Sequence, residues 1–422
     1  MKLISRLKNR DAQIGVIGLG YVGLPLAMEF AKAGFQVQGV DTSKEVVGRV
    51  KECCPACEDV SSELLAKLIA AGRFEPTTDY DVLRDCDAIC ICVPTPLAAD
   101  REPDLSFVES ASRETAARLR ADQLVVLEST SYPGTTAEVV LPILSSNGLA
   151  VGQDFFLGYS PERVDPGNKT YTVKNTPRLV AGITPQCLEA TVTLYSQIVD
   201  QVVEVSSPAA AEMAKLLENT FRAVNIALAN EVALLCDRLG LDVWEVIEAA
   251  ATKPFGFMKF TPGPGVGGHC IPVDPHYLSW KARQHGFNTR LVDVATQINA
   301  QMPEHVTHKV VAALNEHGIP IDQASVLILG VAYKPDIGDV RETPAAGIIE
   351  ELAQKGAKVT YHDPFVPEFS ANGYRMHSQQ MTEELLASSD CVVLVTNHSA
   401  YPHERIAEKA KILIDTRNAL KG

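Results

Sequence analysis

Cys270 is the residue of this chain whose surroundings best suit chemistry. It lies near the end of residues 257–274, which read FMKFTPGPGVGGHCIPVD. So many glycines and prolines disfavour a helix or a strand, and they predict a rigid loop whose backbone amides can wrap a ligand. A thiolate is the strongest common side-chain nucleophile, and a nearby lysine ammonium lowers the pKa of a thiol. The alternative for Cys270 is a buried structural thiol.

Two polar residues lie close to this cysteine in the sequence. Asp274 follows it by four residues, and His269 directly precedes it. Side chains of adjacent residues usually diverge. We therefore expect His269 to shape the loop rather than to act as a base for Cys270.

A second candidate pair, Lys215 and Asn219, stands in a long helical stretch. Ser207 is a good N-cap, Pro208 suits the first helical position, and no further Gly or Pro occurs before Gly240. A helix of this length measures about 48 Å, and residues four apart project from one face in consecutive turns. Such a helix commonly bridges domains or packs against a second subunit. Its apolar positions predict a buried side: Met213, Leu216, Leu217, Phe221, Val224 and Leu228.

A glycine turn near the N-terminus predicts a dinucleotide site. Residues 18–23 read GLGYVG, between the apolar run 14–17 and a helical pattern over residues 26–31. A second apolar run, residues 35–40, ends on Asp41. This order lets the backbone approach a pyrophosphate at a helix N-terminus, and an acid at the end of the second strand prefers NAD to NADP. Nicotinamide enzymes that carry aldehydes to acids need a thiol, which favours the catalytic interpretation of Cys270.

The same frame returns in the last third of the chain. Residues 325–363 repeat the strand, loop, helix and strand order, and the apolar runs 86–93 and 124–130 find counterparts at 390–395 and 412–416. The second copy lacks the glycine triad but carries Lys334 with Arg341 seven residues on. This indicates a nucleotide diphosphate held by charge, and the alternative is a decayed duplicate kept for packing.

These patterns predict an α/β fold of two doubly wound, Rossmann-like domains joined by a helical middle domain with a long central helix. The expected domains are an NAD-binding domain over residues 1–206, a helical domain with the cysteine loop over 207–310, and a second Rossmann-like domain over 311–422.

Composition excludes several classes of function. The 38 basic and 52 acidic residues give a net charge of −14, which argues against a binder of nucleic acid or of anionic membranes. No apolar run has the length of a membrane span, and residues 1–10 lack the apolar core of a signal peptide, so we expect a cytoplasmic protein. Cys54 and Cys57 form a CxxC without a second ligand pair, so no metal site is expected. Cys86, Cys90 and Cys92 suit a buried strand.

Four further motifs resemble the UDP-sugar 6-dehydrogenase family. They are GVGGHCIPVDP, AEMAKLLENTFRAVNIALANE, YSPER and GVAYKPDIGDVRETP, and the similarity runs in order over nearly the whole chain. The resemblance implies a four-electron oxidation of a sugar CH2OH to a carboxylate with two NAD per turnover. It also places NAD in the first domain and the UDP moiety in the last.

The resemblance assigns catalytic roles residue by residue. Cys270 matches the nucleophile that traps the aldehyde as a thiohemiacetal and then holds a thioester. Lys215 and Asn219 match the pair near the reacting carbon, where an ammonium stabilises oxyanions. Asp274 matches an acid that acts with the lysine through water. Glu162 matches a carboxylate for thioester hydrolysis, and Thr130 a hydroxyl that orders the catalytic water.

The resemblance also implies binding residues. Those for NAD are Gly18, Gly20, Tyr21, Val22, Gly23, Asp41, Lys44, Thr95, Thr130 and Arg341. Those for the UDP-sugar are Glu162, Arg163, Lys215, Asn219, Phe260, Gly263, Gly265, Gly267, Gly268 and Lys334.

One departure bears on the substrate. UDP-glucose enzymes commonly carry a second acid four residues after the first, where this chain has Pro166, with Asp165 one place earlier. SPERVDPGN and GGHCIPVDPHYLSWKAR resemble the N-acetylhexosamine branch. We therefore expect UDP-N-acetylglucosamine first, then UDP-N-acetylmannosamine or UDP-glucose, and a homodimer or higher homo-oligomer. Two alternatives are a two-electron dehydrogenase of the 3-hydroxy-acid or 6-phosphogluconate type and a non-catalytic nucleotide-sugar sensor.

Overall fold

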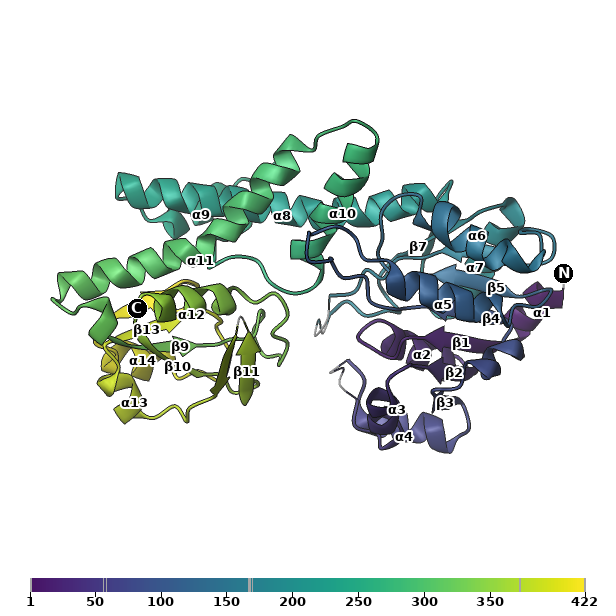
Figure 1. The fold of residues 1–422 in the computed structure, drawn as a ribbon, viewed down its shortest axis with the longest axis horizontal. Helices are drawn as coiled ribbons and strands as arrows, with labels where there is room; N and C mark the ends of the chain where they lie inside the picture. The colour runs from purple at the N-terminus through teal and green to yellow at the C-terminus, as the bar shows by residue number, and fades with distance from the viewer. Residues whose placement is uncertain are drawn as a thin grey trace. The chain divides into compact units, whose positions relative to one another are not determined.

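The computed structural model describes residues 2–55, 57, 59–165, 168, 170–371 and 373–420. Pro166 therefore lies outside the described residues. The chain divides into two compact units: Met1–Glu218 with His276–Gly286, and Asn219–Pro275 with Phe287–Gly422 (Figure 1). The first is called the N-terminal unit and the second the C-terminal unit. The predicted fold class, with its two doubly wound parts and helical middle part, is confirmed, whereas the three exact domain boundaries stay predictions.

The N-terminal unit is built on an eight-stranded sheet in the order β3-β2-β1-β4-β5-β6-β7-β8. Its strands are β1 (Gln13–Ile17), β2 (Gln36–Val40), β3 (Phe74–Thr77), β4 (Ala88–Ile91), β5 (Leu124–Leu127), β6 (Phe156–Tyr159), β7 (Arg178–Gly182) and β8 (Val202–Glu204). Every neighbouring pair is parallel except β6 and β7. The central strands β4, β5 and β6 are wholly buried, as expected for a sheet covered on both faces.

Helices of the N-terminal unit follow the strands in doubly wound order. They are α1 (Lys2–Asn9), α2 (Gly23–Lys32), α3 (Lys44–Lys51), α4 (Ser62–Ala70), η1 (Tyr80–Arg84), α5 (Ser106–Ala116), η2 (Thr136–Val140), α6 (Leu141–Leu144), η3 (Ser145–Asn147) and α7 (Pro185–Tyr195). Side-chain caps fix several of their starts, since Ser43, Ser61 and Thr184 each accept a bond from a backbone N–H three residues on. The predicted strand, glycine turn, helix and strand over residues 14–41 are therefore confirmed.

The antiparallel strand β7 has a consequence for the site. Gly158 of β6 pairs with Gly182, and Tyr159 pairs with Ala181. The first residue of β7, Arg178, therefore lies at the edge where β5 and β6 end. Ligands of open α/β sheets bind at this carboxyl edge.

The C-terminal unit repeats the pattern on a smaller scale. Its parallel sheet has the order β10-β9-β13-β14, and a separate hairpin joins β11 to β12. The elements are β9 (Ser325–Leu329), α12 (Pro344–Gln354), β10 (Lys358–His362), β11 (Glu368–Ala371), β12 (Tyr374–His377), α13 (Glu383–Ser388), β13 (Cys391–Leu394), α14 (His403–Lys409) and β14 (Leu413–Asp415), with the short η4 (Ile321–Gln323). Strands β9, β10, β13 and β14 coincide with the second copy predicted from the sequence, whereas the hairpin of β11 and β12 was not predicted.

The long helices are α8 (Pro208–Leu239), α9 (Val243–Ala251), α10 (Cys270–Gln284) and α11 (Arg290–Glu316). The boundary between the two units falls inside α8 and inside α10. Helix α8 has 32 residues, as predicted, and Ser207 caps it by accepting a bond from the Ala210 N–H.

The predicted buried side of α8 is wrong for most of its residues. Leu216 is buried, but Met213, Leu217, Phe221 and Leu228 are 40–57% exposed, and Val224 is half-buried. The helix instead buries smaller or polar side chains, among them Ala211, Glu212, Ala223, Ala227 and Asn230. Small residues allow close packing within the chain, so the large apolar side chains are left on the outside.

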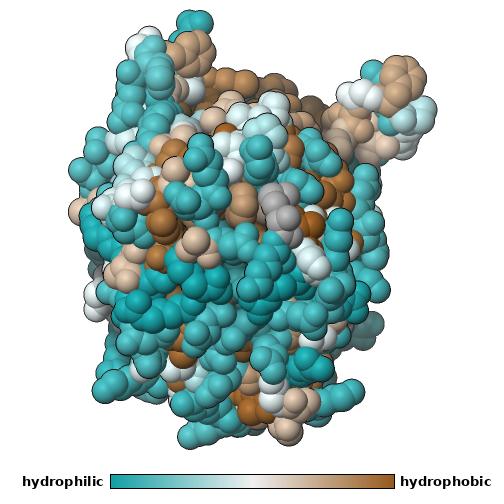
Figure 2. All heavy atoms as spheres, turned by 90° about the vertical axis from the view of Figure 1, so that its right-hand side faces the viewer, coloured by the Kyte–Doolittle hydropathy of each residue, from teal (hydrophilic) through white to brown (hydrophobic). Residues whose placement is uncertain are grey.

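Figure 2 shows the face of the molecule that lies to the right in Figure 1. It is mostly hydrophilic, with hydrophobic residues scattered singly or in small groups, which is normal for a protein surface. Among the helices of the described residues, none combines the length and the apolarity that crossing a bilayer requires.

Candidate active site

The glycine turn at the start of α2 contains three glycines, and each position favours glycine for a different physical reason. Gly18 has φ 92°, and a Cβ there would lie 2.4 Å from the Cys92 carbonyl oxygen. A Cβ on Gly23 would lie 1.9 Å from the Gly18 carbonyl oxygen. At Gly20, by contrast, an added Cβ would meet no described atom of the chain within 4 Å. The chain's own packing does not require Gly20, whereas the approach of a pyrophosphate to the backbone does, so the turn fits a dinucleotide.

Asp41, at the end of β2, is fixed by two backbone donors. Its Oδ2 accepts a bond of 2.9 Å from the Leu19 N–H, and its Oδ1 one of 2.9 Å from the Ser43 N–H. The carboxylate therefore ties the end of β2 to the glycine turn. The next candidate, Lys44, begins α3 and is exposed.

The other NAD candidates of the N-terminal unit lie at the same carboxyl edge of the sheet. Tyr21 is an exposed residue of the glycine turn, and Val22 directly precedes α2. Thr95 is buried in the loop after β4, and Thr130 is half-buried in the loop after β5. The structure thus places these residues on one edge, and their contacts with NAD stay predictions.

A buried charge cluster follows β5 and β6. Arg178 donates through Nη1 to Glu162 Oε2 at 2.7 Å, through Nε to Ser160 Oγ at 2.8 Å, and through Nη2 to Glu128 Oε2. Glu162 Oε1 also accepts bonds from the Arg163 and Val164 N–H groups. Burial works to raise the pKa of Glu162, but Arg178 and these backbone donors hold the pKa below its usual range.

Helix α8 carries Glu212, Lys215 and Glu218 along the N-terminal unit. Glu212 is buried and accepts three bonds, from the Gly134 N–H at 2.6 Å, the Thr136 N–H at 2.9 Å and the Thr136 hydroxyl at 2.6 Å. It thereby fixes the turn that follows Thr130. Lys215, one turn along the helix, is buried.

Arg163, an expected substrate contact, is paired with α8. Its guanidinium lies 2.7 Å from a Glu218 carboxylate oxygen and donates to the Pro177 carbonyl. In the structure, Arg163 therefore fixes the loop that contains Glu162. The contact of Arg163 with substrate stays a prediction.

Asn219 and Asp274 form a buried pair in the C-terminal unit. The Asn219 Nδ2 donates to Asp274 Oδ2 over 2.5 Å. The bond joins α8 to α10, and the helical period places Cys270 one turn before Asp274. Three of the catalytic candidates are thus brought together by two helices of one unit.

The expectation that residues 257–274 form a loop throughout is wrong at its end. Helix α10 begins at Cys270 and continues past Pro275. Pro272 lies in the first turn, where a helical N–H has no partner within the helix, so the ring is tolerated there. Cys270 is exposed at this helix start. The N-terminal end of a helix stabilises negative charge, so this position suits a nucleophilic cysteine.

The rest of the predicted substrate loop is held from both ends. The Gly263 N–H donates to Asn230 Oδ1 at 3.0 Å, and Asn230 in turn donates to Asn299. The Gly268 N–H donates to the Arg341 carbonyl at 2.9 Å. A Cβ on Gly267 would lie 2.7 Å from Tyr333 Cβ, so glycine is needed where the loop meets residues 333–342.

Other candidates of the C-terminal unit lie around this loop. Phe260 packs edge-on against Phe221, with ring centroids 5.8 Å apart, and Gly265 has φ 128°. Lys334 is half-buried and directly follows Tyr333. Arg341 donates four hydrogen bonds to the Asp339 carboxylate, one from its backbone N–H and three from its guanidinium, and its predicted contact with NAD stays a prediction.

Sequence reasoning missed four residues that shape these regions: Glu128, Arg178, Glu212 and Arg417. The Arg417 guanidinium lies so close to Gly263 that a Cβ there would be 2.6 Å from its Nη1, and burial lowers the pKa of Arg417 to about 10. The one available signal for Arg417 was its place just after β14, at the carboxyl edge of the second sheet.

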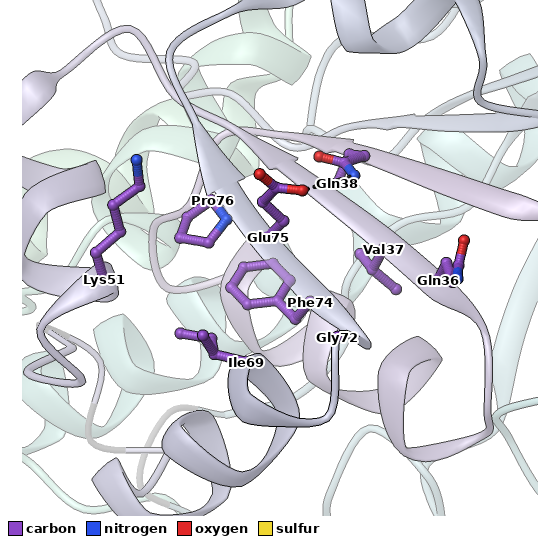
Figure 3. A pocket seen from close by; sticks show the side chains of 9 residues that line it. All are labelled: Gln36, Val37, Gln38, Lys51, Ile69, Gly72, Phe74, Glu75 and Pro76. Carbon is purple, nitrogen blue, oxygen red and sulfur yellow. Dashed lines mark hydrogen bonds between the residues drawn. The ribbon is translucent and has the colours of Figure 1, made fainter.

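A hollow of about 520 Å³ lies elsewhere in the N-terminal unit. Figure 3 shows its lining, from β2, β3 and the helices beside them, with Gln38 bonded to Glu75. It contains none of the candidate residues. Its lining residues are Gln36, Val37, Gln38, Lys51, Ile69, Gly72, Phe74, Glu75 and Pro76.

Comparison with known proteins identifies the family. Three models of the UDP-glucose/GDP-mannose dehydrogenase family match in order: its NAD binding domain over residues 12–199, its central domain over 209–301 and its UDP binding domain over 327–422. A UDP-N-acetyl-D-glucosamine 6-dehydrogenase from Pseudomonas aeruginosa is 37% identical over 397 residues, which are 93% of this chain and 92% of that protein. A UDP-N-acetyl-D-mannosamine dehydrogenase from Pyrococcus horikoshii is 35% identical over 415 residues, 97% of this chain and 96% of that protein.

A solved structure of a UDP-D-ManNAc dehydrogenase from Pyrococcus horikoshii has the same fold. The TM-score is 0.88 at 34% identity, with 97% of this chain and 96% of that chain covered. The matches extend over all three parts of the chain, including the glycine turn, the cysteine loop and the Lys334 loop. The chain therefore belongs to the UDP-glucose/GDP-mannose dehydrogenase family and is an NAD-dependent UDP-sugar dehydrogenase.

Proposed function

We propose that this enzyme oxidises the C6 hydroxymethyl group of a UDP-N-acetylhexosamine to a carboxylate and consumes two NAD+ per sugar. UDP-N-acetylglucosamine is the first candidate, with UDP-N-acetylmannosamine and UDP-glucose as alternatives. The observation that carries the proposal is the exposed Cys270 at the start of α10, one helical turn from the buried Asn219–Asp274 pair. An oxidation that stops at the aldehyde needs no such thiol.

The substrate preference is argued from the relatives and from the sequence motifs. Relatives of similar identity are named for UDP-N-acetyl-D-glucosamine and for UDP-N-acetyl-D-mannosamine. The sequence motifs around Glu162 and Cys270 resemble the N-acetylhexosamine branch, which favours an acetamido sugar over glucose. The two acetamido sugars differ at C2, far along the ring from the reacting C6.

In the proposed reaction, Cys270 holds the sugar between the two oxidations. Bound NAD+, held at the glycine turn and Asp41, would accept a hydride in each oxidation. The Cys270 thiolate adds to C6 of the aldehyde, forming a C–S bond and a thiohemiacetal, and loss of the second hydride leaves a thioester. Water then attacks the thioester carbonyl, Glu162 accepts a proton from that water, and the C–S bond breaks to release the thiolate and the carboxylic acid.

We assign the stabilisation of charge in this scheme to residues of α8 and α10. Each addition to C6 places negative charge on an oxygen, and the Lys215 ammonium is the cation we assign to it. Asn219 holds Asp274 through its 2.5 Å bond, so that the carboxylate is oriented for proton transfer through water. Lys334 and the loop of residues 263–268 are assigned to the UDP moiety, and Thr130 to the ordering of the hydrolytic water.

We also propose that the enzyme is a homodimer or a higher homo-oligomer. Along α8 the exposed apolar residues recur at spacings of four and seven, which places them on one face. They are Met213, Leu217, Phe221, Leu228, Leu235 and Leu239. A second copy of the chain is the occupant we assign to this face. A cytoplasmic location remains our proposal, because both NAD and nucleotide sugars are metabolites of that compartment.

The test supplies several UDP-hexoses with NAD+ and counts NADH by absorbance against the acid formed. We expect two NADH per sugar with the preferred UDP-N-acetylhexosamine, and no acid from Cys270→Ser. One NADH per turnover with release of free aldehyde would overturn the four-electron proposal. Unchanged activity in Cys270→Ser would favour a two-electron dehydrogenase, and UDP-sugar binding without any NAD reduction would favour a sensor.

A further inference from the structure

Glu128 is a buried carboxylate for which the proposed reaction has no use. It directly follows β5, and its side chain is wholly buried. The Arg178 side chain is only 3% exposed. The Arg178 guanidinium donates to both carboxylates. Its Nη2 donates to Glu128, and its Nη1 donates to Glu162 over 2.7 Å. Glu162 retains 14% exposure of its side chain. One guanidinium thus pairs with two carboxylates: Glu128 is buried, and Glu162 is partly exposed.

Holding Arg178 in place does not explain why a second carboxylate is buried beside it. Arg178 already has Ser160 and Glu162 as partners, so a second acid is not needed to hold it. A guanidinium balances one carboxylate, and burying a second negative charge beside it costs free energy. Two carboxylates that share one cation also titrate as a pair, because each ionised partner makes the other hold its proton more tightly.

We propose that Glu128 is a positioning residue that acts through Arg178 to keep Glu162 basic enough to accept a proton from the hydrolytic water. The inference rests on the proposed role of Glu162 in thioester hydrolysis. When Glu128 is ionised, it draws on the charge of Arg178, and Glu162 is the stronger base. When Glu128 is protonated, Arg178 serves Glu162 alone, and Glu162 becomes a weaker base that still points the same way.

The other groups that face Glu128 are neutral in this range. Tyr195, at the end of α7, donates its hydroxyl to Glu128 Oε1, and its ring lies 4.9 Å from the Arg178 guanidinium carbon. Cys90 Sγ of β4 is 3.8 Å from the Tyr195 hydroxyl. Burial raises the pKa of Tyr195, of Cys90 and of Cys92 in the loop after β4. Glu128, Glu162 and Arg178 therefore hold the only ionised side chains assigned to this cluster among the described residues.

Of the two acids, Glu128 takes up a proton first as the pH falls. Burial raises the pKa of Glu128 to about 7 despite Arg178, whereas the pKa of Glu162 is held below its usual range. Acid formation should therefore show a limb near neutral pH that belongs to Glu128, and a second one in the acidic range that belongs to Glu162.

The experiment measures the rate of acid formation against pH for the full-length enzyme and two variants. Glu128→Gln fixes the neutral form, so we expect the limb near neutrality to disappear and the plateau above it to fall by about 3- to 10-fold. Tyr195→Phe removes a donor that favours ionised Glu128, so the limb should move to higher pH. Glu189→Gln, on the exposed surface of α7, removes the same charge outside the cluster and should leave the profile unchanged.

The outcomes separate this inference from the reaction itself. If the wild-type enzyme forms no acid from any UDP-hexose, the proposed function has failed. If it forms acid with two NADH, but Glu128→Gln keeps the limb and only lowers the rate uniformly, then Glu128 is structural and the inference is overturned. Normal hydrolysis in Glu162→Gln would overturn it as well. Should Glu128→Gln not fold, the shift in Tyr195→Phe decides, and an unmoved limb there contradicts the inference.

Discussion

Glu212 gives the sharpest prediction about how α8 holds the N-terminal unit together. Glu212→Ala removes three hydrogen bonds at once, from the Gly134 N–H, the Thr136 N–H and the Thr136 hydroxyl. The side chain is fully buried, so two backbone donors lose their acceptor away from bulk solvent. Each such donor costs about 1–3 kcal/mol, and we expect a total loss of about 3 kcal/mol in the free energy of unfolding.

Glu212→Gln should fall between wild type and Glu212→Ala. Its amide oxygen can still accept from Thr136, but the amide NH2 then faces the Gly134 N–H, donor against donor. The matched control is Glu231→Ala, which makes the same truncation on an exposed position of α8 and should leave stability unchanged.

The assay is thermal unfolding followed by circular dichroism, together with turnover measured well below the transition. A loss of about 3 kcal/mol lowers Tm by about 6–12 °C in a unit of this size. Turnover should also fall in Glu212→Ala, because the released turn follows Thr130. A Tm for Glu212→Ala equal to that of Glu231→Ala would refute the reasoning, since it would mean that the three bonds carry no net stabilisation.

Three further predictions test other parts of the account. Gly20→Val should leave Tm nearly unchanged but abolish NADH binding in a fluorescence titration, whereas Gly18→Ala should lower Tm, because its Cβ would lie 2.4 Å from a carbonyl oxygen; equal losses of Tm would contradict the distinction. The pKa of Glu128 is raised from 4.5 to about 7, so folding binds a proton between these values and the free energy of unfolding should fall as pH rises from about 4.5 to 7. Urea titrations at several pH values should show that the free energy of unfolding falls less with rising pH in Glu128→Gln than in the wild type. The same pH dependence in both proteins would contradict the argument that burial raises the pKa of Glu128. Leu228→Lys, on the exposed apolar face of α8, should reduce the molar mass seen by light scattering to that of one chain, and an unchanged oligomer would remove this face from the interface.

Local signals explain what the sequence predicted well. The turn between β1 and α2 follows from short-range geometry, since Gly18 must adopt a positive φ and a Cβ on Gly23 would lie 1.9 Å from the Gly18 carbonyl oxygen. The start of α8 follows from Ser207 and Pro208, whose preferences for helix N-termini are intrinsic. The second copy of the doubly wound frame was visible because its central strands β9 and β13 are buried apolar runs.

Long-range contacts explain what the sequence did not reveal. Glu128 and Arg178 are 50 residues apart, and they meet only because β7 runs antiparallel to β6. No pattern in the sequence distinguishes an antiparallel strand here from another parallel one. Arg417 reaches Gly263 across the C-terminal unit, which likewise depends on the packing of the second sheet.

Two expectations failed for identifiable physical reasons. The prolines around Cys270 predicted loop, but Pro272 falls in the first turn of α10, where it costs no helical hydrogen bond. The apolar positions of α8 predicted a buried side, but within one chain that helix packs through small residues and leaves Leu217 and Leu228 exposed. A single sequence shows that a face is apolar without showing what covers it.

Mass spectrometry can detect the proposed covalent bond between Cys270 and the sugar. The Glu162→Gln variant is mixed with NAD+ and the preferred UDP-hexose, quenched in acid and digested. The mass of the peptide that contains Cys270 is then measured. We expect an added mass equal to the thioester-linked nucleotide sugar on Cys270, and none in the Cys270→Ser variant. Acid formation by the wild-type enzyme without any adduct on Cys270, or with the adduct on another cysteine, would contradict it.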